Sequence, residues 1–150
     1  MAIEFSDGVG HHSAETRRET EIAIHDILEG NLFRPKGSPG GPYRLVLKIA
    51  ENRLVLEIRL SDQTEHGRIA LSLTPFGRVL KDYQAVCQTW HVAARESHIT
   101  RLEAVDHGRR GLHDEGARLL MERLEERVEL DFATARRLFT LVSALCTKGA

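Results

Sequence analysis

The sequence predicts an α+β fold in which a small three-stranded antiparallel sheet, connected as a meander, packs against about four helices, mainly on one face. Two patterns indicate this class. Apolar and polar residues alternate along short runs in the middle of the chain, and apolar residues recur every three or four positions in longer segments on either side. Hydrophobic residues make up 41% of the 150 residues, which is enough for one core. We therefore expect a single domain over residues 13–150, preceded by a flexible N-terminal tail over residues 1–12.

The first expected element is a helix from Ser13 to about Glu29. The Ser13 hydroxyl can cap its start, and the Gly30-Asn31 pair is a typical stop signal. The apolar face of this helix recurs at three- and four-residue spacing. It consists of Thr20, Ala23, Ile24, Ile27 and Leu28.

The sheet is expected in the middle of the chain, after a loop of turn-forming residues at 35–42. Residues 43–49 and 54–60 alternate between apolar and polar side chains, and Glu51-Asn52 can form the tight turn between them. A third run, 68–73, follows a polar turn. The three runs together predict an antiparallel meander.

Three helices are expected after the sheet. Thr74 followed by Pro75 is a typical helix start, and the apolar stripe that follows predicts the main helix packed on the sheet. A second helix covers residues 99–127, either continuous or broken between Gly108 and Gly111. The last helix begins after Asp131, whose carboxylate can cap it. The stripe of the first of these helices consists of Phe76, Val79, Leu80, Tyr83, Val86, Cys87, Trp90 and Ala94.

The composition limits the function classes. The net charge is −1, so the chain lacks the positive excess with which a protein coats a DNA duplex. No run approaches the ~20 apolar residues of a membrane span, and the start has no secretory signal pattern. We therefore expect a cytoplasmic protein without membrane contact. Cys87 and Cys146 fall on apolar helix positions and are interpreted as buried free thiols. We expect no cofactor.

The strongest candidate site lies in the segment 106–116. On a helical projection, Arg109 and His113 fall in a sector that otherwise holds apolar residues, with Asp106 at its edge. Because removing a guanidinium from water costs several kcal/mol, Arg109 needs a partner. Asp106 lies three residues before Arg109 and four before Arg110, and His113 lies four after Arg109. These side chains can therefore meet along one helix face.

Glycines interrupt the same segment. Gly108, Gly111 and Gly116 each cost an exposed helix about 1 kcal/mol relative to alanine. This cost indicates either that another part of the protein approaches closely or that the helix breaks and presents backbone amides to a ligand.

Three interpretations of the cluster remain open. Asp106, Arg109 and His113 can form a purely structural polar network, including one at a dimer interface. Alternatively, Arg109 and Arg110 can clamp an anionic small molecule, a nucleotide or an acidic peptide. In the third interpretation a small hydrolase or transferase uses His113 as general acid or base, oriented by Asp106 or Asp114. The spacing of the histidines and carboxylates does not match a zinc site, so we expect no metal.

The preferred function is a binding or regulatory module that recognises a small anionic ligand or a partner protein, acting as a homodimer. The sequence contains no phosphate-binding loop, no dinucleotide fingerprint and no serine in a nucleophile elbow. Arg44, Arg59, Arg78 and Arg136 can join the cluster if the fold brings their elements together. The predicted ligand-binding residues are Asp106, Arg109, Arg110, His113, Arg78 and Arg136.

Four separated motifs resemble one family. They are GGPYRL at 40–45, LSLTPF at 71–76 with KDY at 81–83, GRRGLH at 108–113, and DF at 131–132 with TARRLFT at 134–140. In this order they are similar to uncharacterised protein family 0262 of alphaproteobacteria. The resemblance spans roughly residues 14–145. It implies a single-domain cytoplasmic bacterial protein and assigns no activity, cofactor or catalytic residue.

Overall fold

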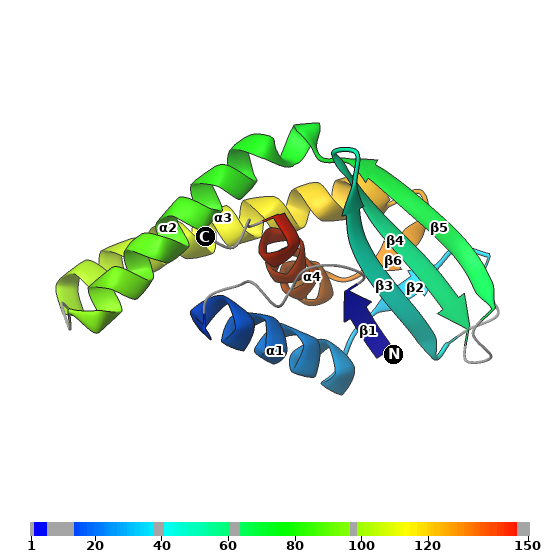
Figure 1. Cartoon of the computed structure of the whole chain (residues 1–150), viewed down its shortest axis with the longest axis horizontal. Helices are drawn as coiled ribbons and strands as arrows, with labels where there is room; N and C mark the ends of the chain where they lie inside the picture. Colours follow the sequence, from blue (N-terminus) through cyan, green and yellow to red (C-terminus); the bar gives the residue numbers. More distant parts are fainter. Residues whose placement is uncertain (1, 6–13, 38–40, 61–63, 97–98, 147–150) are drawn as a thin grey trace.

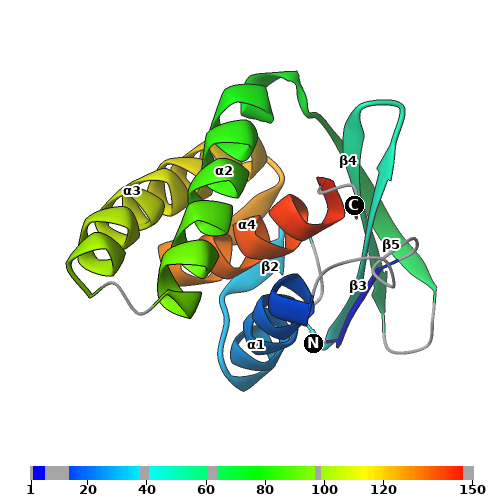
Figure 2. The same cartoon turned by 60° about the vertical axis from the view of Figure 1, so that its left-hand side comes forward.

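The computed structural model describes residues 2–5, 14–37, 41–60, 64–96 and 99–146. A four-stranded sheet lies on one side, and the helices cover one of its faces (Figures 1 and 2). The first half of the chain contains β1 (Ala2–Phe5), α1 (Ala14–Glu29), β2 (Phe33–Pro35), β3 (Tyr43–Ala50), β4 (Arg53–Leu60) and β5 (Glu65–Ser72). The second half contains the 3₁₀ helix η2 (Thr74–Phe76), then α2 (Gly77–Arg95), α3 (Ile99–Leu124), β6 (Val128–Leu130) and α4 (Phe132–Cys146).

The antiparallel meander is confirmed in strands β3, β4 and β5. Glu51 and Asn52 both have positive φ, at 51° and 58°, as a two-residue hairpin turn of this hand requires. The register places Leu47 opposite Leu56 on the buried face. The alternation of the sequence therefore places most of the apolar residues of these strands on one face of the sheet, while Val46 and Val55 lie on the other.

The N-terminal tail expected over residues 1–12 contains a strand, which corrects that part of the prediction. β1 adds to the sheet beside β3 as a parallel neighbour, with Ile3 opposite Leu45. Four residues are too few to show a period of two, and a parallel partner joins from a distant part of the sequence through backbone hydrogen bonds. The predicted cap Ser13 lies outside the described residues.

A second, two-stranded sheet was not expected. β2, which overlaps the start of the predicted loop, pairs antiparallel with β6, with Arg34 opposite Glu129. Backbone hydrogen bonds from Lys36 to Arg127 and from Asp131 to Leu32 extend the pairing at both ends. Strands of three residues carry no readable periodicity, which explains why the sequence did not reveal them.

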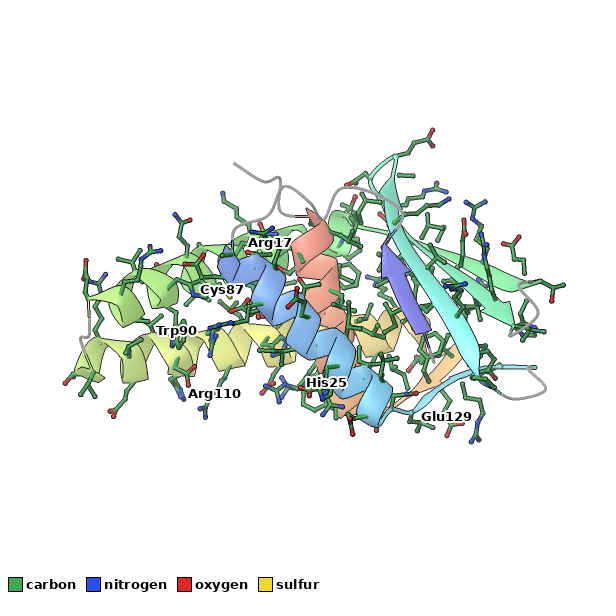
Figure 3. The ribbon with its side chains drawn as sticks, turned by 60° about the horizontal axis from the view of Figure 1, so that its bottom comes forward. Arg17, His25, Cys87, Trp90, Arg110 and Glu129 are labelled. Atoms are coloured by element: carbon green, nitrogen blue, oxygen red, sulfur yellow. The ribbon has the colours of Figure 1, made fainter. Side chains whose placement is uncertain are left out.

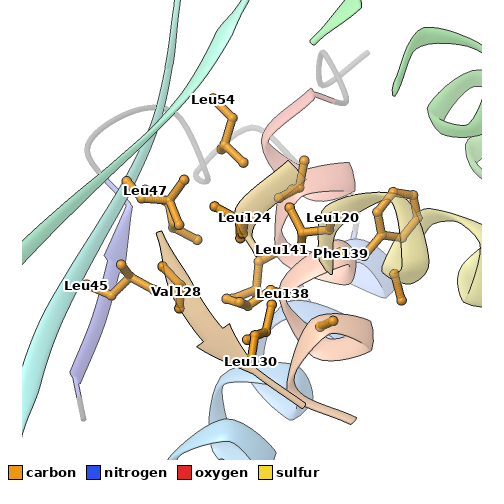
Figure 4. Packing of buried hydrophobic residues seen from close by; sticks show 14 of the residues in the cluster. Leu45, Leu47, Leu54, Leu120, Leu124, Val128, Leu130, Leu138, Phe139 and Leu141 are labelled. Carbon is orange, nitrogen blue, oxygen red and sulfur yellow. The ribbon is translucent and has the colours of Figure 1, made fainter. Parts of the chain in front are cut away.

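The helix that packs on the sheet is α4 rather than α2, so that prediction is wrong. α4 lies between the sheet and the other helices, whereas α2 pairs along its length with α3 and both run away from the sheet (Figure 1). The centre of the core is built mainly of leucines from β3, β4, the C-terminal part of α3 and α4, with Val128 and Leu130 of β6 (Figure 4). Buried residues of α1, β2, β5 and α2 pack around this centre. The apolar stripe of α2 faces α3 over much of its length, which a single sequence cannot distinguish from a face packed on a sheet.

Two predicted helix starts have different outcomes. The Asp131 cap is confirmed, because its Oδ1 accepts a hydrogen bond of 2.8 Å from the backbone N–H of Thr134. Thr74 does not cap α2: a 3₁₀ turn containing Pro75 comes first, and the Thr74 hydroxyl accepts a hydrogen bond from Asn52 in the hairpin turn. The helix α3 is continuous through Gly108 and Gly111.

Candidate functional site

A cavity of ≈ 410 Å³ opens between α1, α3 and α4. Arg109, Arg110 and His113 line it from α3, while α4 contributes two further arginines. Tyr83 of α2 reaches it from below the surface and is 7% exposed. The remaining lining residues are Glu19, Ile22, Ala23, Asp26, Ala133, Arg136, Arg137 and Thr140. The central segment of α3 thus lies at a concave surface built by three helices.

Asp106 holds the two predicted clamp residues. Its Oδ1 accepts a 2.7 Å hydrogen bond from NH2 of Arg109, and its Oδ2 lies 2.8 Å from Nε of Arg110. The hydrogen bond from Arg109 is the largest influence and holds the pKa of Asp106 below its usual value, against an opposing effect of burial. Asp106 is therefore ionised at neutral pH. It does not line the cavity.

Arg109 also connects three helices. Its guanidinium lies 4.4 Å from the centre of the Trp90 ring of α2, a cation–π distance. Its NH1 lies 3.9 Å from Glu19 of α1, and the same carboxylate oxygen lies 3.3 Å from Nε2 of His91. Figure 3 shows Trp90 between the ribbons of α2 and α3, with Arg110 on the other side of α3. Contacts with α1, α2 and Asp106 of its own helix thus fix the position of Arg109 at the cavity wall.

His113 is bonded through both ring nitrogens. Nε2 lies 2.7 Å from the carbonyl oxygen of Arg136 and 3.0 Å from the Thr140 hydroxyl, and Nδ1 lies 3.4 Å from NH2 of Arg136. Since a carbonyl only accepts, these contacts fit a neutral ring with its proton on Nε2. The ring stacks on Tyr83 at 5.3 Å. Burial, the largest cause, lowers the pKa of His113, so the ring is neutral at pH 7.

The two arginines of α4 complete the cavity. Nε of Arg136 lies 3.0 Å from Oδ1 of Asp114, which ties α4 to α3. NH1 of Arg137 donates to the backbone oxygens of Asp26 and Gly30 at the C-terminal end of α1, at 3.4 and 3.0 Å. A guanidinium at this end is favourable because the last carbonyls of a helix lack backbone partners.

The cysteines supply no activated nucleophile. Both are free, and burial raises the pKa of the Cys87 thiol and of the Cys146 thiol to about 11. A thiol must ionise to attack, and these thiols remain protonated at neutral pH. The hydroxyl of Tyr83, whose pKa burial also raises, remains protonated as well.

Three of the four arginines that were expected to join the cluster if the fold allowed it lie outside the cavity. Arg78 pairs with Glu115 and with Asp82, and it does not line the cavity. Arg44 and Arg59 lie opposite each other on the face of the sheet that is turned away from the helices. Arg136 does reach the cavity. Sequence reasoning did not assign Glu19, Asp26, Arg137 and Trp90 to the site, because they come from other helices and no local spacing links them to α3.

The three glycines of α3 have two different environments. A Cβ atom on Gly116 would lie 2.3 Å from the Phe139 ring, so this position admits only a hydrogen. A Cβ atom on Gly108 would reach Val86 at an ordinary 3.9 Å, and one on Gly111 would have nothing within 4 Å. Close approach therefore explains Gly116, and nothing within the described residues requires the other two glycines.

A second cavity, of ≈ 610 Å³, lies between the C-terminal part of α3 and the β2–β6 sheet. Its charged lining residues are Arg34, Lys36, Arg118, Glu122, Glu125 and Glu129. Three cations face three anions, so it has no preference for a ligand of either sign. The described residues contain no group of three metal-ligating side chains and no helix that is both long and apolar enough to cross a membrane.

The comparisons with known proteins identify a family. The sequence profile of uncharacterised protein family UPF0262 matches residues 1–148. A UPF0262 protein of Xanthobacter autotrophicus is 50% identical over 99% of this chain and 92% of its own length. Those of Nitrobacter hamburgensis and Rhizobium meliloti are 48% and 45% identical over 95% and 98% of this chain, and 87% and 93% of their own lengths. No solved structure matches the chain significantly. The chain belongs to the UPF0262 family, which has no assigned function.

Proposed function

We propose that this member of the UPF0262 family is a binding module that holds a small anionic ligand in the cavity between α1, α3 and α4. The observation that carries the proposal is the convergence of four guanidinium groups from two helices on one cavity. Those groups belong to Arg109, Arg110, Arg136 and Arg137, and the carboxylates among the lining residues are Glu19 and Asp26. Guanidinium groups bind carboxylates and phosphates through two parallel hydrogen bonds.

Arg110 is the arginine best placed to contact a ligand. Its side chain is 73% exposed, and its ion pair with Asp106 uses only Nε. Within the described part of the chain no ion pair engages its terminal NH1 and NH2 groups. Arg109 instead serves as a positioning residue, because Asp106, Glu19 and Trp90 already hold it. The ligand would therefore approach the cavity from the Arg110 side.

The geometry favours binding over acid–base catalysis. A general base needs a ring nitrogen that can reach a substrate proton, and both nitrogens of His113 already have protein partners. Its lowered pKa keeps it neutral, which suits a structural support beneath the arginines. No serine or activated cysteine appears among the residues that line the cavity.

Isothermal titration calorimetry at fixed ionic strength tests the proposal, with inorganic phosphate, citrate, benzoate and phenyl phosphate as probes. Removing a hydrogen bond to a charged ligand costs roughly 1.5–3 kcal/mol, so Arg110→Ala should weaken binding about tenfold or more. The matched control is Arg101→Ala, which removes an exposed arginine of the same helix that does not line the cavity. Binding that is equal in both variants, or no binding of any probe to the natural protein, would show the proposal to be wrong.

A further inference from the structure

The cavity has a second wall of different chemistry. Ile22 of α1 lines it and remains 54% exposed, although isoleucine is among the residues most often buried. Ala23 lies on the same wall, and Ala133 of α4 adds another apolar surface. The Tyr83 ring at the base is almost completely buried. The guanidinium groups of α3 and α4 thus share one cavity with a wall from α1, on which the exposed Ile22 lies between the carboxylates of Glu19 and Asp26.

Ile22 differs from the other exposed apolar residue of α1. Leu28 is 48% exposed, yet it does not line the cavity. Single exposed apolar residues are ordinary on a protein surface, and Leu28 needs no further explanation. Ile22 is instead placed where a bound molecule would cover it, because it lies on the wall of a concave site. Covering it would remove apolar surface from water and strengthen binding.

We infer that the ligand is an amphiphilic anion, in which one carboxylate or phosphate group is attached to an apolar alkyl or aryl body. This inference rests on the proposed function and adds the class of ligand. The anionic group contacts Arg110 and its neighbours from α4, and the apolar body lies against Ile22, whose side chain is exposed at the cavity wall. The cavity of ≈ 410 Å³ falls within the usual range of small-molecule sites.

A chain-length series tests the class of ligand. Calorimetric titrations with acetate, butanoate, hexanoate and octanoate, and with methyl, butyl and octyl phosphate, measure how affinity depends on the apolar body. Each methylene that becomes buried should tighten binding about fourfold. The two head groups in the series distinguish a carboxylate from a phosphate ligand.

Two variants of α1 assign the effect to the apolar wall. Ile22→Ser should flatten the dependence on chain length, while Leu28→Ser, a matched change outside the cavity, should leave it unchanged. Both side chains are exposed, so neither change should prevent folding. The same series with Arg110→Ala should show weaker binding at every chain length, because that variant removes part of the contact with the head group.

The outcomes separate the two claims. If phosphate and acetate bind as tightly as octanoate and the binding depends on Arg110, the anion site stands and the amphiphilic ligand is rejected. If affinity rises with chain length but Ile22→Ser does not change the slope, the apolar body lies elsewhere and the inference is overturned. If long-chain anions bind independently of Arg110, the proposed function itself is wrong. Loss of the slope in Ile22→Ser alone supports the inference.

Discussion

The two halves of α3 are stabilised in different ways. The C-terminal half, residues 112–124, packs into the core, whereas the N-terminal half, residues 99–111, is held mainly by ion pairs. Every position of this helix is described, and its four buried residues all lie in the C-terminal half. They are Gly116, Ala117, Leu120 and Leu124. In the N-terminal half, Arg109 and Asp106 pair with each other, and Arg109 packs on Trp90. Both halves contain glycine, but close packing requires only Gly116 of the C-terminal half.

This difference in burial between the two halves explains why the candidate site lies near the centre of α3. Beyond His113, the buried half meets the second cavity, whose charges are balanced, and the far end of the exposed half lies away from the sheet beside α2 (Figure 1). Only near the junction do α1 and α4 approach α3 closely enough to enclose a cavity. Arg110 and His113 lie on either side of that junction. The predictions below test each half, beginning with the largest expected effect.

Gly116→Ala should cause the largest loss of stability. The new Cβ atom would lie 2.3 Å from the ring of Phe139, which is fully buried and cannot move without disturbing the core. Overpacking of this kind costs roughly 1–3 kcal/mol, and we expect the upper end of that range. Urea denaturation measures the change. The double variant with Phe139→Leu should lose less than the sum of the two single changes, and strict additivity would contradict the proposed contact.

Arg109→Ala should cause a moderate loss of about 1–2 kcal/mol in the free energy of unfolding, because it removes a charge-assisted hydrogen bond and a cation–π contact. Arg110→Ala should change stability by less than about 0.5 kcal/mol, since its side chain is 73% exposed. Thermal unfolding of the two variants provides the comparison. Equal losses would mean that Arg110 also has a structural role, and its use as a binding probe would then be compromised.

The pH dependence of stability should reveal the buried His113. Its folded pKa lies below the ordinary value of 6.5, so between these two pH values the unfolded chain binds a proton that the folded protein does not. Stability is therefore complete above pH 6.5 and falls as the pH decreases toward the folded pKa. In His113→Gln this part of the decline should disappear. An unchanged pH profile between the variant and the natural protein would show that folding does not lower the pKa of His113, which contradicts a buried ring.

The sequence predicted the parts of the fold that repeat a local pattern. The meander alternates over long strands, Glu51 and Asn52 fit their turn, and the Asp131 cap depends on neighbouring residues. It did not reveal β1 or the β2–β6 pair, because three or four residues show no period and their partners are distant in the chain. The packing of α2 on α3 was also missed, since an apolar stripe does not indicate which element it contacts.

The sequence predicted only those contacts of the candidate site that form within a single helix, α3. The spacing of Asp106, Arg109 and Arg110 predicted that these side chains meet, and they do. The partners Glu19 and Arg137 come from α1 and α4, where each is an ordinary charged residue in its local sequence. Their role depends on the packing of three helices. The position of Arg109 in an apolar sector of the helix therefore predicted a polar cluster. Only the packing of the helices shows that this cluster borders a cavity.

Gly111→Ala should have a small effect of opposite sign. Nothing lies within 4 Å of a Cβ atom at this exposed position, so alanine fits and removes the entropic cost of a helical glycine. The free energy of unfolding should rise by about 0.5–1 kcal/mol, measured by urea denaturation. If the variant is instead less stable, or if sedimentation shows a smaller assembly than for the natural protein, a second molecule must approach α3 at Gly111. The glycine would then be explained by close contact, as Gly116 is, and the exposed half of α3 would be an interface.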